Sequence, residues 1–357
     1  MRIAILGVGL IGGSIGLAAR RRLRAEVSGF DPEQVTLRRA VEREAIDKAA
    51  GSVEEACAGA EIVVCAAPVS ALPELAAAAL TASGRAAVVT DVGSTKREIV
   101  DRLGDDERFI GGHPLAGAET SGVEHARPDL LEGARWYLTP TARSSGLHYD
   151  RLQRSIAELG ARPQAIDAAA HDRLMATVSH LPHVIANVLV SQAADELADG
   201  SERLPEAGPS LRDTTRVAGA NPEIWGDIFA SNREAVAEAV EATARRLREA
   251  AELIRTGDRD SVARWHGQAA GDRRRLLEAE HAGGPLRELR VAVPNRPGVV
   301  AELALALGRA SVNIEDMALH PAPDMRSGAI SVWVAGDEEA GRAVELLREL
   351  GYSVAVE

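Results

Sequence analysis

The chain has 357 residues, a length typical of two or three domains. Hydrophobic residues make up 46% and aromatic residues only 3%, which is typical of a globular α/β or α-helical protein. A net charge of −12 argues against a nucleic-acid-binding surface, so we expect no nucleic acid partner. Two cysteines provide no disulfide framework, and we find no signal peptide and no uninterrupted apolar window of membrane length. We therefore expect a cytoplasmic protein without membrane contact.

The N-terminal segment predicts a dinucleotide-binding turn. The apolar run over residues 3–6 is typical of a buried parallel strand, and it leads into G-x-G-x-x-G at 7–12 and a helical run over 14–22. The first glycine permits a tight turn, the second lets the backbone approach a pyrophosphate, and the third lets helix and strand pack closely. The helix N-terminus adds unpaired N–H groups. The expected cofactor contacts here are Gly7, Gly9, Leu10, Ile11 and Gly12.

Asp31 indicates which dinucleotide binds. It stands at the end of a second strand-like run, residues 26–30. A carboxylate at this position accepts both hydroxyls of the adenosine ribose and repels a 2′-phosphate, so we expect NAD rather than NADP. A glycine-rich turn without a ligand is the alternative. The preceding strand, the following helix and the acid at the expected distance all argue against it.

The remaining patterns predict three domains. Residues 1–168 alternate strand-like and helical runs, which indicates a Rossmann-type, doubly wound α/β sheet. Residues 169–282 carry long Ala/Leu/Val-rich helical patterns with a polar break at 199–213, and residues 286–357 follow the ferredoxin-like order βαββαβ. The expected strands of the first domain are 3–6, 26–30, 61–66, 86–91, 108–111, 135–139 and 162–166. In the last domain we expect strands at 286–293, 312–319, 329–334 and 352–356, and helices at 298–309 and 338–350. Ala67 and Pro68, after the strand over 61–66, should line the cofactor cleft.

His113 is the strongest candidate for acid–base chemistry. It follows a strand end, on the side of the sheet where ligands bind, and glycines flank it. A neutral imidazole near physiological pH suits the removal of a hydroxyl proton as hydride leaves carbon. A structural histidine in a turn is the alternative. Ser94, in the run 91–96, could orient His113, bind the reacting hydroxyl, or cap the next helix with Lys96 in its first turn.

Two further clusters lie in the helical region. Ser179 and His183 are four residues apart and share a helix face, and Pro182 should kink that helix. His180 is better explained by helix packing, and we expect no metal because no third ligand stands out. The run 212–216 carries two arginines, which could bind carboxylates bidentately or could simply be solvated.

Together these motifs resemble the prephenate/arogenate dehydrogenase family of tyrosine biosynthesis. The likeness covers residues 1 to about 280 and rests on ordered motifs at 7–14, 91–96, 112–119, 179–183 and 212–216, before Trp225. It implies that His113 accepts the proton of a substrate 4-hydroxyl with help from Ser94. It also implies a prephenate pocket, with Arg216 on a substrate carboxylate and Trp225 supplied by the neighbouring subunit of a homodimer. The pocket residues implied are Ser179, His183, Arg216, Glu119 and Trp225. Residues 208–211 depart from the family, which usually has a glycine pair and an aromatic there.

The C-terminal module resembles an ACT domain, a module that commonly binds amino acids at its first strand-to-helix loop. The resemblance implies feedback by tyrosine or a related aromatic amino acid, and a purely structural or dimerising role is the alternative. The implied effector contacts are Asn295, Arg296, Pro297, Gly298 and Asn313.

The expected activity is the NAD-dependent oxidative decarboxylation of prephenate to 4-hydroxyphenylpyruvate. Arogenate as the substrate stays open, because no residue that we can name distinguishes a keto from an amino group. Another NAD(P) oxidoreductase of the Rossmann-plus-helical plan is a second alternative. Such an enzyme would be expected to carry a lysine in its helical domain, whereas the only lysines here are Lys48 and Lys96. A non-catalytic sensor of NAD and an amino acid is the third.

Overall fold

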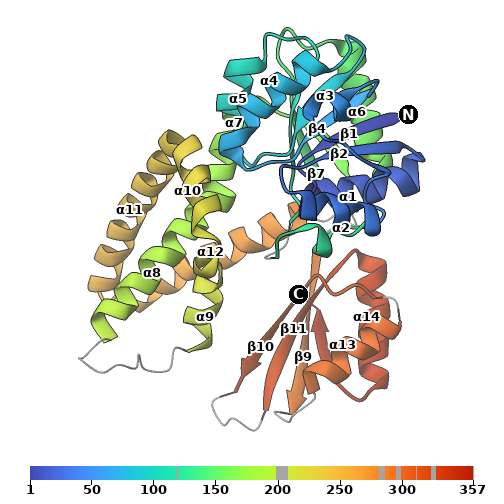
Figure 1. Ribbon diagram of the computed structural model, residues 1–357. Helices are drawn as coiled ribbons and strands as arrows, with labels where there is room; N and C mark the ends of the chain where they lie inside the picture. The colour runs from blue at the N-terminus through green and yellow to red at the C-terminus, as the bar shows by residue number, and fades with distance from the viewer. Residues whose placement is uncertain are drawn as a thin grey trace. The chain divides into compact units, whose positions relative to one another are not determined.

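The computed structural model describes residues 1–117, 120–197, 208–280, 286–294, 299–310, 312–322 and 327–356. They divide into two compact units, residues 1–246 and 247–357, which we describe in turn (Figure 1). The first unit holds the α/β region together with most of the helices that follow it. It therefore contains every candidate catalytic residue.

A five-stranded parallel sheet organises the first unit, in the order β3-β2-β1-β4-β5. Its strands are β1 (Arg2–Leu6), β2 (Glu26–Phe30), β3 (Lys48–Ala49), β4 (Ile62–Cys65) and β5 (Val88–Asp91). The order reverses at β1, so the crevice beyond the carboxyl ends of β1 and β4 is the expected ligand site of such a sheet. The sequence did not predict β3, because two exposed residues form it and no apolar run marks it.

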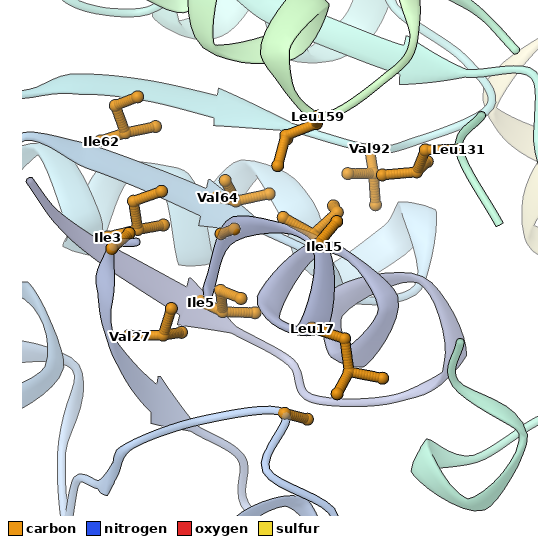
Figure 2. Packing of buried hydrophobic residues seen from close by; sticks show 14 of the residues in the cluster. Ile3, Ile5, Ile15, Leu17, Val27, Ile62, Val64, Val92, Leu131 and Leu159 are labelled. Carbon is orange, nitrogen blue, oxygen red and sulfur yellow. The ribbon is translucent and has the colours of Figure 1, made fainter. Parts of the chain in front are cut away.

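Helices cover both faces of this sheet. Ile3 and Ile5 of β1 point into one core with Val27 and Val64, as Figure 2 shows, whereas the alternating Ala4 and Leu6 belong to a second core. The first core includes residues of α1 (Leu10–Ala18), α2 (Gln34–Glu42) and α6 (Gly146–Glu158). The second includes residues of α3 (Val53–Cys57), α4 (Leu72–Ala82) and α5 (Arg97–Leu103). This is the doubly wound arrangement that the sequence predicts.

The predicted seven-stranded sheet is wrong in its second half, because the last three strands form a sheet of their own. These are β6 (Gly111–Pro114), β7 (Arg135–Thr139) and β8 (Arg162–Ala165), in the order β6-β7-β8, with β6 antiparallel to β7. The strand expected at 108–111 contributes only one bridge to β5, between Phe109 and Val89. Gly112 then donates its N–H to the Asp91 side chain at 3.0 Å, so the chain leaves the β5 ladder where β5 ends.

Helices continue the first unit. They are α7 (Ala168–Met175), α8 (Leu181–Leu197), α9 (Pro209–Thr215), α10 (Pro222–Ser231) and α11 (Arg233–Arg255), the last of which continues into the second unit. The distortion predicted at Pro182 takes the form of a π-helical turn at Ala176–His180, in which Leu181 N–H bonds the carbonyl of Ala176. Pro182 has no N–H to continue a regular ladder, and a wider turn before it accommodates that loss. The predicted polar break ends earlier than expected, because α9 begins at Pro209.

One helical run departs from the expectation that no segment could cross a membrane. Residues Ala168–Asp195 are long enough and apolar enough by composition, with a mean hydropathy of 1.4. The same run carries the buried polar residues His171, Asp172 and His180, all hydrogen-bonded to other parts of the first unit. These contacts identify it as part of a folded unit.

The second unit contains α12 (Arg259–Glu280) and the predicted βαββαβ order. Its elements are β9 (Leu286–Pro294), α13 (Val299–Arg309), β10 (Asp316–Pro321), β11 (Ser327–Ala335), α14 (Asp337–Glu349) and β12 (Ser353–Val356). The antiparallel sheet has the order β10-β11-β9-β12, and Leu303 and Leu347 of α13 and α14 pack against it. The second strand begins at Asp316 rather than at residue 312, so Asn313 lies in the loop before it.

His180 is a packing residue of the helical region, as the sequence predicts. Its side chain is only 1% exposed, and its Nδ1 accepts a hydrogen bond from Asn232 Nδ2 at 3.1 Å. The same amide donates to the carbonyl of Asp172 at 2.8 Å, which joins α7 to the end of α10. Burial lowers the pKa of His180 from 6.5 to about 4, and a proton on Nδ1 would abolish the bond from Asn232.

Acidification should therefore weaken the fold between pH 6.5 and 4. In that range the folded protein keeps His180 neutral while the unfolded chain takes up a proton, so the free energy of unfolding falls as the pH drops, by at most about 3 kcal/mol. Urea denaturation of the wild type and of His180→Asn at several pH values measures this effect. We expect a smaller pH slope in the variant, and equal slopes would contradict the account.

Candidate active site

The glycines of the first turn have the environments that a dinucleotide site requires. Gly7 has φ = +96°, and a Cβ there would lie 2.2 Å from the carbonyl oxygen of Ala66. A Cβ on Gly12 would lie 2.0 Å from the carbonyl oxygen of Gly7, so neither position has room for a side chain. A Cβ on Gly9 would meet nothing within 4 Å among the described residues. This open space leaves the backbone accessible to a phosphate group.

The start of α1 and Asp31 complete the fit to NAD. Within the described chain no side chain caps α1 at Gly9, so the amides at Leu10 and Ile11 can face an anion. Asp31 follows β2 and is partly exposed. Its Oδ2 accepts the N–H of Val8 and its Oδ1 accepts the N–H of Glu33, both at 3.0 Å. A carboxylate fixed in this way still has lone pairs for the two ribose hydroxyls.

Ala67 and Pro68 follow β4 at the carboxyl edge of the sheet, as expected of residues beside the cofactor cleft. The turn after them, Val69–Ala71, packs against α10. There the Ser70 hydroxyl donates to the Asp227 carboxylate. A second bond, 3.0 Å long, joins the hydroxyls of Thr95 and Ser231. These contacts hold the helical region against the edge of the sheet where a dinucleotide binds.

His113 lies at the same edge. It belongs to β6, and the neighbouring Gly112 is bonded to Asp91, the last residue of β5. The ring is partly buried, and its Nδ1 lies 2.9 Å from Nε2 of His171. Burial, and then the neighbouring His171 and Lys96, hold the pKa of His113 well below its usual 6.5. The imidazole is therefore neutral near pH 7, the state in which it can accept a proton.

His171 and Asp172 are site residues that the sequence did not reveal. They lie on α7, and Asp172 Oδ1 is 2.8 Å from His171 Nδ1. The Asp172 carboxylate also accepts the backbone N–H groups of Lys96 at 2.7 Å and Arg97 at 2.9 Å, so it caps α5 from a different helix. His171 is 58 residues from His113, and no spacing rule connects them. The adjacent His-Asp pair was the only available signal.

Ser94 does not cap α5. The N-cap position of that helix is Lys96, and the capping side chain is that of Asp172. Among the described residues Ser94 makes no hydrogen bond to His113, whose Nδ1 bonds His171 instead. Lys96, expected in the first helical turn, is fully buried in an ion pair with Asp91. Ser94 stays partly buried in the loop between β5 and α5.

A cleft of about 770 Å³ brings His183, Arg216 and Trp225 together. The rings of His183 and Trp225 stack, with centroids 3.4 Å apart and planes 25° from parallel. This stacking joins two residues of the same chain, and the supply of Trp225 by a neighbouring subunit stays a prediction. Burial lowers the pKa of His183, and the Arg216 guanidinium lowers it further. The cleft thus combines an aromatic wall with a cation and a neutral imidazole.

The segment after His113 forms another wall of this cleft, through Gly117, Thr120 and Ser121. Ser179 is partly buried in the π-helical turn, next to His180, whose ring meets Trp225 edge-on at 5.9 Å.

Some of the expected site residues lie outside the described residues. They are Glu119 and the effector contacts Asn295, Arg296, Pro297 and Gly298. Asn313 is exposed, and its Nδ2 donates to Glu315 at 2.6 Å. Within the described ranges, no three His, Cys, Asp or Glu side chains form a group that could hold a metal.

Comparison with known proteins agrees with this geometry. Residues 15–164 match the model of the prephenate dehydrogenase nucleotide-binding domain, and residues 167–268 match that of the prephenate dehydrogenase dimerization domain. The prephenate dehydrogenase of Lactococcus lactis subsp. cremoris is 33% identical over 86% of this chain and 86% of its own. That of Bacillus subtilis is 28% identical over 97% of this chain and 95% of its own.

A solved structure shows the same architecture. The Aquifex aeolicus prephenate dehydrogenase, crystallised with hydroxyphenyl propionate and NAD+, is 30% identical and superimposes with a TM-score of 0.73. The match covers 77% of this chain and 98% of the Aquifex chain. By sequence, fold and site, this chain belongs to the prephenate dehydrogenase family.

Proposed function

We propose that this chain oxidises prephenate with NAD as the hydride acceptor and forms 4-hydroxyphenylpyruvate and carbon dioxide for tyrosine biosynthesis. One observation carries the proposal: the neutral imidazole of His113 lies at the carboxyl edge of the nucleotide-binding sheet. The chain that follows His113 lines the cleft that contains Arg216 and His183. A proton acceptor, a cofactor edge and a cationic pocket thus occur in one unit.

The chemistry needs a base and a binding site for an anion. Prephenate carries a ring carboxylate at C1, a pyruvyl side chain and a hydroxyl at C4 of a cyclohexadiene ring. When bound, NAD supplies the acceptor for the hydride from C4. His113 takes the hydroxyl proton as the C4 carbonyl forms, and the electrons of the C1–carboxylate bond move into the ring as carbon dioxide leaves. Aromatisation drives that loss, so the protein mainly positions the substrate and neutralises its carboxylates.

The pocket residues divide these tasks. Arg216 binds a substrate carboxylate, and the stacked rings of His183 and Trp225 form the wall against the substrate ring. Ser94, on the loop after β5, and Ser179, in the π-helical turn, contribute hydroxyls near the reacting centre, and Glu119 contacts the substrate from the segment after His113. The cofactor is held by residues of the first turn, the end of β2 and the loop after β4: Gly7, Gly9, Leu10, Ile11, Gly12, Asp31, Ala67 and Pro68.

A homodimer is the proposed assembly. Residues 167–268 match a dimerization-domain model, and the helices in this region expose large apolar side chains in the single chain. These are Val178, Val188, Val190, Leu247 and Ile254. Burial of such side chains against a second copy is favourable in water.

We retain the division into a nucleotide-binding domain at 1–168, a helical domain at 169–282 and a regulatory domain at 286–357. We also place the protein in the cytoplasm.

The βαββαβ module is proposed to be an ACT domain that binds tyrosine or a related aromatic amino acid. The order of its elements and its antiparallel sheet support this assignment. The loop before β10 offers a polar site at Asn313, held by Glu315 and by a 3.3 Å bond from its N–H to Glu339. The effector would contact this loop together with residues 295–298.

Replacing the proposed base tests the activity directly. We expect His113→Asn to lower kcat by roughly 10²–10⁴-fold, the usual contribution of a general base, with little change in substrate binding. Absorbance of NADH formed from prephenate and NAD measures turnover, and His266→Asn, at an exposed position on α12, is the matched control. Wild-type turnover in His113→Asn would remove His113 from this role. Arogenate and NADP in the same assay decide between the alternative substrates and cofactors.

The role of Arg216 is tested by a paired substitution. Loss of a charge-assisted hydrogen bond to a carboxylate should raise KM for prephenate roughly 10- to 100-fold in Arg216→Ala, with a small effect on kcat. Arg212→Ala is the matched control, because Arg212 is exposed one turn earlier and does not line the cleft. A loss confined to kcat in Arg216→Ala, or an equal rise of KM in both variants, would contradict the binding role.

Effector binding is tested on the full chain. Isothermal titration with tyrosine should show saturable binding, and Asn313→Ala should weaken it because the loop before β10 loses a hydrogen-bonding side chain. Phenylalanine and tryptophan in parallel titrations define the specificity. Absence of binding by all three amino acids would leave the module without an aromatic effector.

A further inference from the structure

Three side chains form a continuous hydrogen-bonded series that ends at the proposed base. His113 Nδ1 lies 2.9 Å from His171 Nε2, and His171 Nδ1 lies 2.8 Å from Asp172 Oδ1. The two rings meet edge to face, with centroids 5.1 Å apart and planes at 74°. His171 is fully buried and Asp172 is 3% exposed. This series is shielded from water at its inner end and reaches the partly exposed ring of His113 at its outer end.

The carboxylate decides which atom of each ring carries a proton. Asp172 already accepts two backbone N–H groups, at Lys96 and Arg97, and an ionised carboxylate has no hydrogen to donate. His171 must therefore donate from Nδ1. With Nδ1 protonated, a neutral His171 has a lone pair on Nε2, so it accepts the hydrogen of His113 Nδ1. His113 is then left with its lone pair on Nε2.

We propose that His171 and Asp172 are positioning residues that hold His113 in the tautomer with its proton on Nδ1, so that Nε2 is the atom that accepts the substrate's hydroxyl proton. The proposal rests on the proposed function of His113 as the base. Among the described residues none hydrogen-bonds Nε2 of His113, which leaves that atom available to a substrate. The opposite tautomer would place a hydrogen on Nε2, where it cannot act as the acceptor.

In this step one proton moves, from the substrate hydroxyl to His113, and no proton passes between the rings of His113 and His171. The hydroxyl proton forms a bond to Nε2, the O–H electron pair becomes part of the new C4 carbonyl, and hydride departs from C4 to NAD. His113 becomes a cation with hydrogens on both nitrogens. Its Nδ1–H stays bonded to His171, whose own Nδ1–H stays bonded to the Asp172 carboxylate. That carboxylate stabilises the charge through the intervening ring. When carbon dioxide leaves and the ring becomes aromatic, the electron pair from C1 reaches the C4 oxygen, which takes the proton back from His113 Nε2 and becomes the phenolic hydroxyl.

The surrounding structure prevents the series from turning away. The Asp172 side chain caps α5, and its carbonyl accepts the amide of Asn232 at 2.8 Å. The Tyr137 ring lies against His171 with centroids 5.6 Å apart, at 80°. Contacts with β7, α5 and the residue after α10 thus fix the helix that carries His171. Because His171 is held in one orientation, His113 is held in one orientation as well.

Two amide substitutions at residue 171 separate the roles of its ring nitrogens. In His171→Gln the side-chain amide reaches the place of Nε2, and its carbonyl can accept from His113. In His171→Asn the amide reaches only the place of Nδ1, so the bond to Asp172 survives and the bond to His113 is lost. We expect kcat of His171→Gln to stay within about tenfold of wild type and that of His171→Asn to fall roughly 10²-fold, both with KM for prephenate nearly unchanged.

Nitrogen-15 NMR of the histidine-labelled full-length protein gives a readout independent of turnover. The signals of His113 are assigned by their absence in His113→Asn. At neutral pH we expect a protonated Nδ1 and an unprotonated Nε2 in wild type and in His171→Gln, and a loss of this preference in His171→Asn. Thermal melts of each variant show whether its fold is retained.

Several results would overturn the proposal. One is a proton on Nε2 of His113 in the wild type, which decides the question even if a variant fails to fold. Another is a folded His171→Gln that is as slow as His171→Asn, or an unchanged tautomer in His171→Asn. A different failure is also recognisable: if His113→Asn turns over normally while the tautomer is as stated, His113 is not the base, although His171 still orients it.

Discussion

The rest of the site depends on the hydrogen bonds that the Asp172 carboxylate accepts. It accepts the N–H groups at the start of α5 and the Nδ1 hydrogen of His171, so one buried anion joins a helix of the nucleotide-binding region to a helix of the region that follows it. The positive end of the α5 dipole and two backbone amides stabilise this charge. His171 in turn orients His113. The base is therefore held in a fixed position relative to the region that binds the cofactor.

The substrate cleft is connected to Asp172 as well, through both hydrogen bonds and aromatic contacts. Asn232 links Asp172 to His180, and the His180 ring meets Trp225, which stacks on His183. A series of polar and aromatic contacts thus runs from the base to the pocket that contains Arg216. Because each member of the series packs against the next, a change at the inner end should alter the geometry at the outer end.

The sequence predicts features that depend on local chemistry. The turn at Gly7, the acid at Asp31 and the strands of the first half of the sheet follow from short patterns, because neighbouring residues in the chain are enough to form them. The sequence could not predict contacts that the tertiary fold creates. The two-residue β3, the separate three-stranded sheet and the pairing of His113 with His171 depend on residues far apart in the chain. The stacking of Trp225 on His183 of its own chain is another contact between residues far apart in the sequence.

In the proposed mechanism, His113 Nε2 receives the proton of the ring hydroxyl. The most direct test is a crystal structure of the wild-type protein with NAD and 4-hydroxyphenylpyruvate, whose phenolic oxygen derives from that hydroxyl. The account predicts that this oxygen lies within hydrogen-bonding reach of His113 Nε2, roughly 2.6–3.2 Å. A complex in which the oxygen contacts a different side chain, and His113 Nε2 faces away from the bound ring, would contradict it.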